Sequence, residues 1–202
     1  MAAAWLPDYD GGAAADDFDT HQDPTYHWRR HDSFDTLAPA VDESPLPGEQ
    51  PAQLAQRLAA LKARAGAANA PGTVVIGSDQ VAALGTQILG KPGSVERAVS
   101  QLLQCSGQLV VFHTAVCVLG PGSDARLDCL DTTRVRFRTL TEAMARRYVA
   151  ADQPLDCAGS FKAERRGVLL LANIDSSDPT AIQGLPLIWL AHALQECGVE
   201  ML

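Results

Sequence analysis

Long apolar runs are missing from this sequence of 202 residues. No stretch of about 18 apolar residues occurs, so the sequence predicts no transmembrane helix. The opening MAAAWLPDYDGG has neither a basic region nor a long apolar region, and it predicts no signal peptide. The five cysteines include no C-x-x-C pair, which favours reduced thiols over a disulfide framework or a zinc site. We therefore expect a cytoplasmic protein without a membrane partner.

Positive charge is also scarce, since the formal net charge is −8. Nucleic acids and anionic lipids bind positive surfaces, so we expect no nucleic-acid partner. Several catalytic motifs are absent as well: the sequence has no Walker loop, no G-x-G-x-x-G, no H-E-x-x-H and no G-x-S-x-G. The better-known nucleotide-binding loops, zinc peptidases and serine hydrolases are therefore not indicated.

The charge is unevenly distributed along the chain. Residues 1–36 contain eight Asp and two Arg, a net charge of −6, and they contain no Val, Ile, Glu or Lys. The remaining residues hold 16 acids and 14 bases, a net charge of −2. We expect 1–36 to be an atypical acidic segment, either disordered or read in a shifted frame or from a wrongly chosen start. Residues 37–202 are expected to form the folded domain.

Apolar periodicity after residue 37 predicts alternating helices and strands, and thus an α/β fold with a mixed sheet. In the first helix, Leu54, Leu58, Leu61 and Ala65 form the apolar stripe, and Lys62 lies off it. Helices are expected at 51–66, 94–105, 141–150 and 185–197, strands at 73–81, 108–119, 128–139 and 167–174, and a hairpin around Gly85.

Three acidic residues each follow an ordered apolar segment: Glu43, Asp79 and Glu164. Lys62 and Lys91 also lie near expected element ends. Carboxylates can hold Mg²⁺ and accept a proton from water, and lysines neutralise phosphate oxygens. The combination suits phosphate chemistry, although ordinary solvated surface charges remain an alternative for each residue.

Two further groups of residues give weaker indications of a functional site. Histidines 21, 27 and 31 lack a recognised metal-ligand spacing, and no apolar core surrounds them in the sequence. Arginines 134, 136 and 138 alternate with Val135 and Phe137, which predicts a half-buried strand with a basic outer face. A solvent face is the simpler interpretation of that stripe.

Six motifs in order resemble the Maf family of nucleotide pyrophosphatases. They are APAVDE at 38–43, a helix with Lys62, VVIGSDQV at 74–81, GKP at 90–92, DCAGSFKAE at 156–164 and DPTAIQGLPL at 178–187. The pair GSDQ and CAGSFK-x-E resembles the YceF-type subgroup. The resemblance implies a two-lobed α/β fold, similar to that of ITPases, with a twisted mixed sheet and a cleft between the lobes. It further implies metal-assisted hydrolysis of 7-methyl-GTP to the monophosphate and pyrophosphate.

The resemblance also implies roles for single residues. Asp79 matches the catalytic proton acceptor, and Glu43 and Asp79 match carboxylates that would hold Mg²⁺ or Mn²⁺. Lys62 and Lys91 match lysines that face phosphate, and Gln80 and Glu164 match positions that select the substrate. In the triplet Trp28-Arg29-Arg30, Trp28 matches a third specificity position, and Arg29 and Arg30 match phosphate-binding residues. The implied partner is a nucleotide, and a homodimer is left open.

Two other functions stay open at this point. Pro24 and Tyr26 replace the two serines that precede the family triplet, so the chain could instead be a weakly active or inactive nucleotide-binding homologue. A protein-interaction role in cell-division control is a third alternative, and no residue argues for it specifically.

Overall fold

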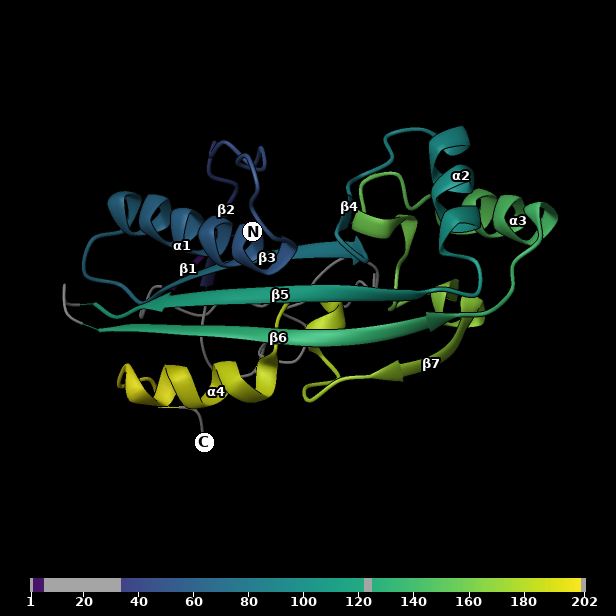
Figure 1. Ribbon diagram of the computed structural model, residues 1–202. Coiled ribbons are helices and arrows are strands. Elements are labelled where there is room, and N and C mark those ends of the chain that lie inside the picture. Colours follow the sequence, from purple (N-terminus) through teal and green to yellow (C-terminus); the bar gives the residue numbers. More distant parts are fainter. Residues whose placement is uncertain (1, 6–33, 122–124, 201–202) are drawn as a thin grey trace, which may run out of the picture.

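The computed structural model describes residues 2–5, 34–121 and 125–200. A single sheet dominates it, flanked by helices (Figure 1). The strands are β1 (Ala2–Trp5), β2 (Phe34–Leu37), β3 (Val75–Leu84), β4 (Gln87–Leu89), β5 (Leu109–Leu119), β6 (Arg126–Phe137) and β7 (Leu171–Asp175). The helices are α1 (Pro51–Asn69), α2 (Val95–Cys105), α3 (Glu142–Asp152) and α4 (Leu187–Glu196), with short 3₁₀ turns η2 (Ala158–Ser160), η3 (Arg166–Leu170) and η4 (Ala181–Gln183).

The sheet has the order β2-β1-β3-β5-β6-β7, and β4 pairs with β3. Every strand pair among the described residues is antiparallel. The expected mixed sheet is therefore wrong, while the expected combination of helices and sheet is present. The connection between β3 and β5 explains the difference, because β4 and α2 return the chain to the end of the sheet where β3 finishes. After α2, β5 starts beside the end of β3, so that Ala83 pairs with Val111.

Different helices pack against different parts of the long strand β5. On β5, Ala115 and Cys117 pack into a core with α1, while Val116 and Val118 pack into a core with α4. The two helices accordingly lie on opposite faces of the sheet (Figure 1). At the other end of β5, Phe112 joins a third core with α2 and α3. One strand, buried on both faces over residues 114–118, thus supports three groups of helices.

Most expected elements are present, with shifted ends. Ser94 and Thr141 accept hydrogen bonds from the third residue of α2 and α3, as N-caps do. Arg134, Arg136 and Arg138 are exposed, while Val135 and Phe137 are buried, so the predicted alternation is confirmed.

Other segments differ from the expectation. The strand expected at 167–174 begins only at Leu171, because η3 precedes it. Ala2–Trp5 forms β1 between β2 and β3, where the sequence showed no periodicity. No described helix combines the length and the apolar character that crossing a bilayer requires.

Candidate active site

Three charged side chains from separate parts of the chain meet at one point. The Lys62 Nζ atom on α1 lies 2.6 Å from Asp79 Oδ1 on β3 and 2.7 Å from Glu43 Oε1 in the segment between β2 and α1. The Lys62 side chain is 8% exposed and the Asp79 side chain 11%, whereas half of the Glu43 side chain is exposed. The structure therefore brings together three of the residues that the sequence singled out, with Glu43 on the solvent side.

Close packing of α1 on β3 makes this contact possible. A Cβ atom at Gly77 would lie within 3.0 Å of the Ala59 carbonyl oxygen and of the Ala63 backbone nitrogen. Only glycine allows the helix to approach the strand so closely. Lys62 precedes Ala63, and Asp79 lies two residues beyond Gly77 on the same face of β3. The Gly77 contact therefore sets the distance between the two charged groups.

The buried face of α1 differs from the predicted stripe. Leu54 and Leu58 are buried as expected, but Leu61 and Ala65 are only partly buried. The fully buried positions instead include Ala55, Ala59 and Ala63, together with Lys62. Placing Lys62 off the buried stripe was wrong. Small alanines form the contact face because the facing residue on β3 is Gly77. The buried face of α1 is therefore rotated about the helix axis from the predicted stripe, and Lys62 lies on it.

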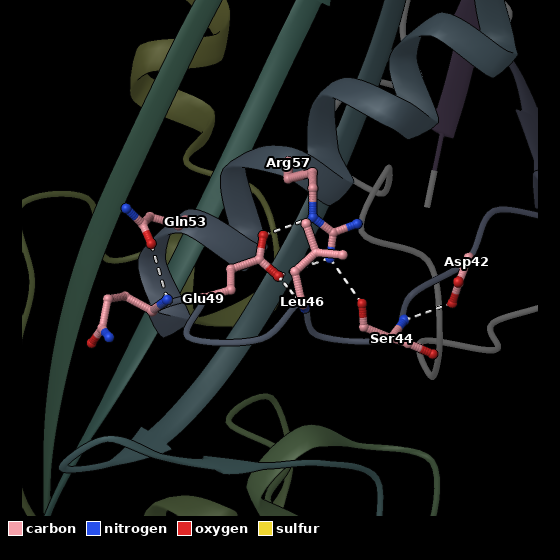
Figure 2. Close-up of polar contacts among 7 residues, drawn as sticks. Asp42, Ser44, Leu46, Glu49, Gln53 and Arg57 are labelled. Carbon is pink, nitrogen blue, oxygen red and sulfur yellow. Dashed lines mark hydrogen bonds and ion pairs between the residues drawn. The ribbon is translucent and has the colours of Figure 1, made fainter.

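The loop that carries Glu43 is fastened to α1 by an arginine (Figure 2). Arg57 Nη2 donates to the Ser44 carbonyl oxygen at 2.9 Å, and Arg57 also makes a two-point pair with Glu49 at 2.7 and 2.9 Å. Asp42 accepts a hydrogen bond from the Ser44 backbone at 2.9 Å. Both contacts fix the residues next to Glu43, which directs its carboxylate toward Lys62.

The cluster shifts the ionisation of all three groups. The hydrogen bond from Lys62 lowers the pKa of Glu43. Burial raises the pKa of Asp79, and the ion pair with Lys62 only partly opposes this effect. Burial works to lower the pKa of Lys62, but the hydrogen bonds to Asp79 and Glu43 outweigh it and raise that pKa. Asp79 is consequently a stronger base than an ordinary aspartate.

Asp79 lies in the middle of β3, although the sequence suggested that GSDQ ends its strand. The alternation of the strand sends Asp79 toward α1 and sends Ser78 and Gln80 to the opposite face. There, Ser78 Oγ donates to the Gly184 carbonyl oxygen at 2.7 Å, and Gln80 Nε2 donates to the Ala181 carbonyl oxygen at 2.9 Å. Asp79 and Gln80 thus point to different sides of the sheet.

The DPT motif after β7 caps a helix. Asp178 is buried and accepts hydrogen bonds from the backbone of Thr180 and of Ile188, the second residue of α4. Thr180 Oγ1 accepts from the Leu187 backbone at 2.8 Å. The resemblance flagged this motif without a role. Pro186 is the N-cap residue of α4, and Asp178 and Thr180 lie well before it in the chain, so no local capping pattern signals this contact.

The other site residues of the folded region lie outside the three-residue cluster. Lys91 is exposed, and its charge helps to lower the pKa of Glu43. Glu164 is exposed on the loop after η2. On the same loop, Lys162 Nζ lies 3.5 Å from Asp156 Oδ1, with a side chain only 11% exposed. Lys162 was not among the residues expected in the site. Trp28, Arg29, Arg30 and the three N-terminal histidines lie outside the described residues.

The residues present fit a divalent cation in part. Glu43 Oε1 and Asp79 Oδ1 both lie within 2.7 Å of the position of Lys62 Nζ, so two hard oxygen donors face one point. Among the described residues, no group of three or more His, Cys, Asp or Glu side chains could hold a metal. Mg²⁺ commonly binds one or two carboxylates and completes its shell with water and substrate phosphate. The pair thus suits a cation that arrives with, or awaits, a phosphate ligand.

Comparison with known proteins agrees with the resemblance drawn from the motifs. The family model described as Maf-like protein matches residues 29–197. The chain is 53% identical over 173 residues to the 7-methyl-GTP pyrophosphatase of Polaromonas sp. (strain JS666), covering 86% of this chain and 79% of that protein. It is 54% identical over 168 residues to the protein of that name from Xanthomonas oryzae pv. oryzae, covering 83% and 87%. The Nitrosococcus oceani protein of that name is 46% identical over 169 residues, covering 84% and 85%. With a match over most of its length and such identities, the chain belongs to the Maf family.

Proposed function

We propose that this protein hydrolyses 7-methyl-GTP to 7-methyl-GMP and pyrophosphate. The observation that carries the proposal is the cluster of Glu43, Lys62 and Asp79, in a chain about half identical to proteins named for this activity. The cluster combines a buried carboxylate base with a convergent pair of oxygen donors, and both suit water attack on a phosphoanhydride.

Asp79 is the proton acceptor in the reaction we propose. Its carboxylate takes a proton from water as the water oxygen bonds to the α-phosphorus, and the bond from that phosphorus to the bridging oxygen of pyrophosphate breaks. Burial raises the pKa of Asp79, which strengthens it as a base. Before a cation binds, the bond from Lys62 holds this carboxylate in place. A divalent cation, Mg²⁺ or Mn²⁺, bound by Glu43 and Asp79 would supply positive charge for the triphosphate.

Binding and selection of the nucleotide fall to the surrounding residues in this proposal. Lys91, with an exposed side chain, would meet phosphate oxygens. Glu164 would accept hydrogen bonds from the guanine N–H groups, and its charge would favour the cationic methylated base. Gln80 and Trp28 are proposed as further specificity residues, and Arg29 and Arg30 as phosphate ligands.

We also infer the setting of the enzyme. Residues 37–202 hold the described site and would form the pyrophosphatase domain, preceded by the acidic segment 1–36. All five cysteines are free thiols, which suits a reducing compartment such as the cytoplasm. The partner required by the reaction is the nucleotide alone.

Pyrophosphate release from a panel of nucleotides tests the function. With Mg²⁺ or Mn²⁺, 7-methyl-GTP should be turned over faster than GTP, ATP, CTP and UTP. Asp79→Asn should lower kcat by about 100-fold or more, since positioned acid–base groups contribute effects of that size. Asp128→Asn is the matched control, because Asp128 pairs with Arg126 in an exposed position on β6.

Two results would count against the proposal. Undiminished turnover by Asp79→Asn, with a native circular dichroism spectrum, would remove Asp79 as the base. Binding of 7-methyl-GTP without pyrophosphate release by the unaltered chain would favour the alternative of an inactive nucleotide-binding homologue.

A further inference from the structure

We propose that the Lys62 ammonium group and the divalent cation compete for the same carboxylate oxygens, so that Lys62 occupies the cation site until the cation displaces it. This inference rests on the proposed function, because it concerns the metal-holding pair of the same site. It differs from the phosphate-facing role that the resemblance implies for Lys62.

The geometry places the ammonium group where a cation would bind. Lys62 Nζ makes contacts of 2.6 Å with Asp79 Oδ1 and 2.7 Å with Glu43 Oε1, which are short even for charge-assisted hydrogen bonds. Both carboxylates therefore point at one position, and that position holds a positive charge. A divalent cation that uses the same two oxygen atoms cannot bind while the ammonium group stays.

Burial makes the lysine contact persistent. The Lys62 side chain is 8% exposed, so water competes little for its hydrogen bonds. The neighbouring Ala59 and Ala63 are buried against β3 at Gly77, and this packing holds the helix backbone in place. The flexible end of the side chain and the half-exposed Glu43 are the parts that can move. Displacement would therefore begin at the Glu43 contact.

Charge neutralisation explains why such an arrangement is stable without a metal. Two carboxylates that share a site repel each other. Lys62 offsets this repulsion, just as a metal would. An internal cation of this kind weakens metal binding in the nucleotide-free protein and makes tight binding depend on the extra ligands that a triphosphate brings.

Mn²⁺ binding to the nucleotide-free protein tests the competition directly. Electron paramagnetic resonance of free Mn²⁺ gives the affinity without any turnover. Lys62→Met should bind Mn²⁺ at least about tenfold more tightly than the unaltered protein, because a positive charge at contact distance has been removed. Arg147→Met is the matched control: this exposed arginine on α3 has no ion pair within the described part of the chain, and its loss should change the affinity by less than threefold.

A second measurement uses the unaltered protein and needs no substitution. The chain contains only three lysines, at 62, 91 and 162, so the ¹⁵Nζ ammonium spectrum of labelled protein is simple. A buried, hydrogen-bonded ammonium group exchanges slowly with water and should give a resolved signal for Lys62. Titration with Mg²⁺ should shift or remove that signal as the ion pairs break, and should leave the Lys162 signal in place.

Unchanged or weaker Mn²⁺ binding by folded Lys62→Met overturns the proposal, and so does a Lys62 signal that Mg²⁺ at saturating concentration leaves unaltered. Absence of Mn²⁺ binding by both proteins overturns it as well. None of these results decides the proposed function, which depends separately on pyrophosphate release by the unaltered chain.

Discussion

Replacing Gly77 by alanine should push α1 away from β3 and lengthen the contact between Lys62 and Asp79. The new methyl carbon would lie 2.7 Å from the Ala63 Cβ atom, whereas ordinary contacts begin at 3.4 Å. The difference between those two distances is about 0.7 Å, and the Ala59 carbonyl oxygen and the Ala63 nitrogen would lie closer still, so the helix must retreat by at least this much. If the shift reaches Lys62 undiminished, its 2.6 Å contact with Asp79 becomes about 3.3 Å, which is beyond the usual range of charge-assisted hydrogen bonds.

The energetic effect follows from the same overlap. Forcing one extra methyl group into a packed interface costs about 1–3 kcal/mol. In a domain of this size, each kcal/mol lowers Tm by about 2–4 °C. Gly77→Ala should therefore lower Tm by roughly 2–12 °C and should reduce kcat for 7-methyl-GTP, because α1 would no longer hold Lys62 at its native distance from Asp79 and the bound phosphates.

Thermal unfolding followed by circular dichroism, combined with pyrophosphate release at 25 °C, measures both effects. Gly90→Ala is the control, because a Cβ atom there meets nothing within 4 Å and the backbone is not in the left-handed region. An unchanged Tm for Gly77→Ala would refute the packing argument. A lowered Tm with unchanged kcat would refute the claim that this packing positions the base.

Two further predictions concern stability. Asp178→Ala should lower the free energy of unfolding in urea by about 1–3 kcal/mol, because the Thr180 and Ile188 N–H groups lose their buried acceptor; a change below 0.5 kcal/mol would contradict the capping role. Arg57 lowers the pKa of Glu49 from 4.5 to about 2, so the unfolded chain binds the extra proton between these values and stability falls as the pH is lowered through them. Arg57→Met should make this decline shallower in urea titrations between pH 2.5 and 6, and an identical decline would show that the Arg57–Glu49 pair does not cause it.

The elements of the fold followed well from local patterns, and their pairing did not. The alternation around Val135 and the caps at Ser94 and Thr141 depend on neighbouring residues, so the sequence located them. The direction of each strand depends on the path of the chain between strands. The connection through β4 and α2 brings the chain back to the end where β3 finishes, so β5 runs antiparallel to β3, which periodicity within one strand cannot reveal.

The candidate site was only partly predictable for a similar reason. The motifs identified Glu43, Lys62 and Asp79, but helical periodicity placed Lys62 away from the buried face. The spacing of the leucines predicted the buried stripe of α1, whereas the closest contact with β3 is made by alanines that pack against Gly77. The periodicity of α1 cannot show that Gly77, on another element, allows the helix backbone to pack closely against β3. This packing places Lys62 on the buried face.

The sequence by itself determined the class of the protein, its family, the identity of the charged residues and the approximate starts of the helices, because these depend on composition and on contacts within a few residues. Only the tertiary structure decided that Lys62 lies between two carboxylates, 19 residues from Glu43 and 17 residues from Asp79 in the chain. The physical reason is close packing: one missing side chain at Gly77 fixes how near α1 comes to β3, and that distance places the charges.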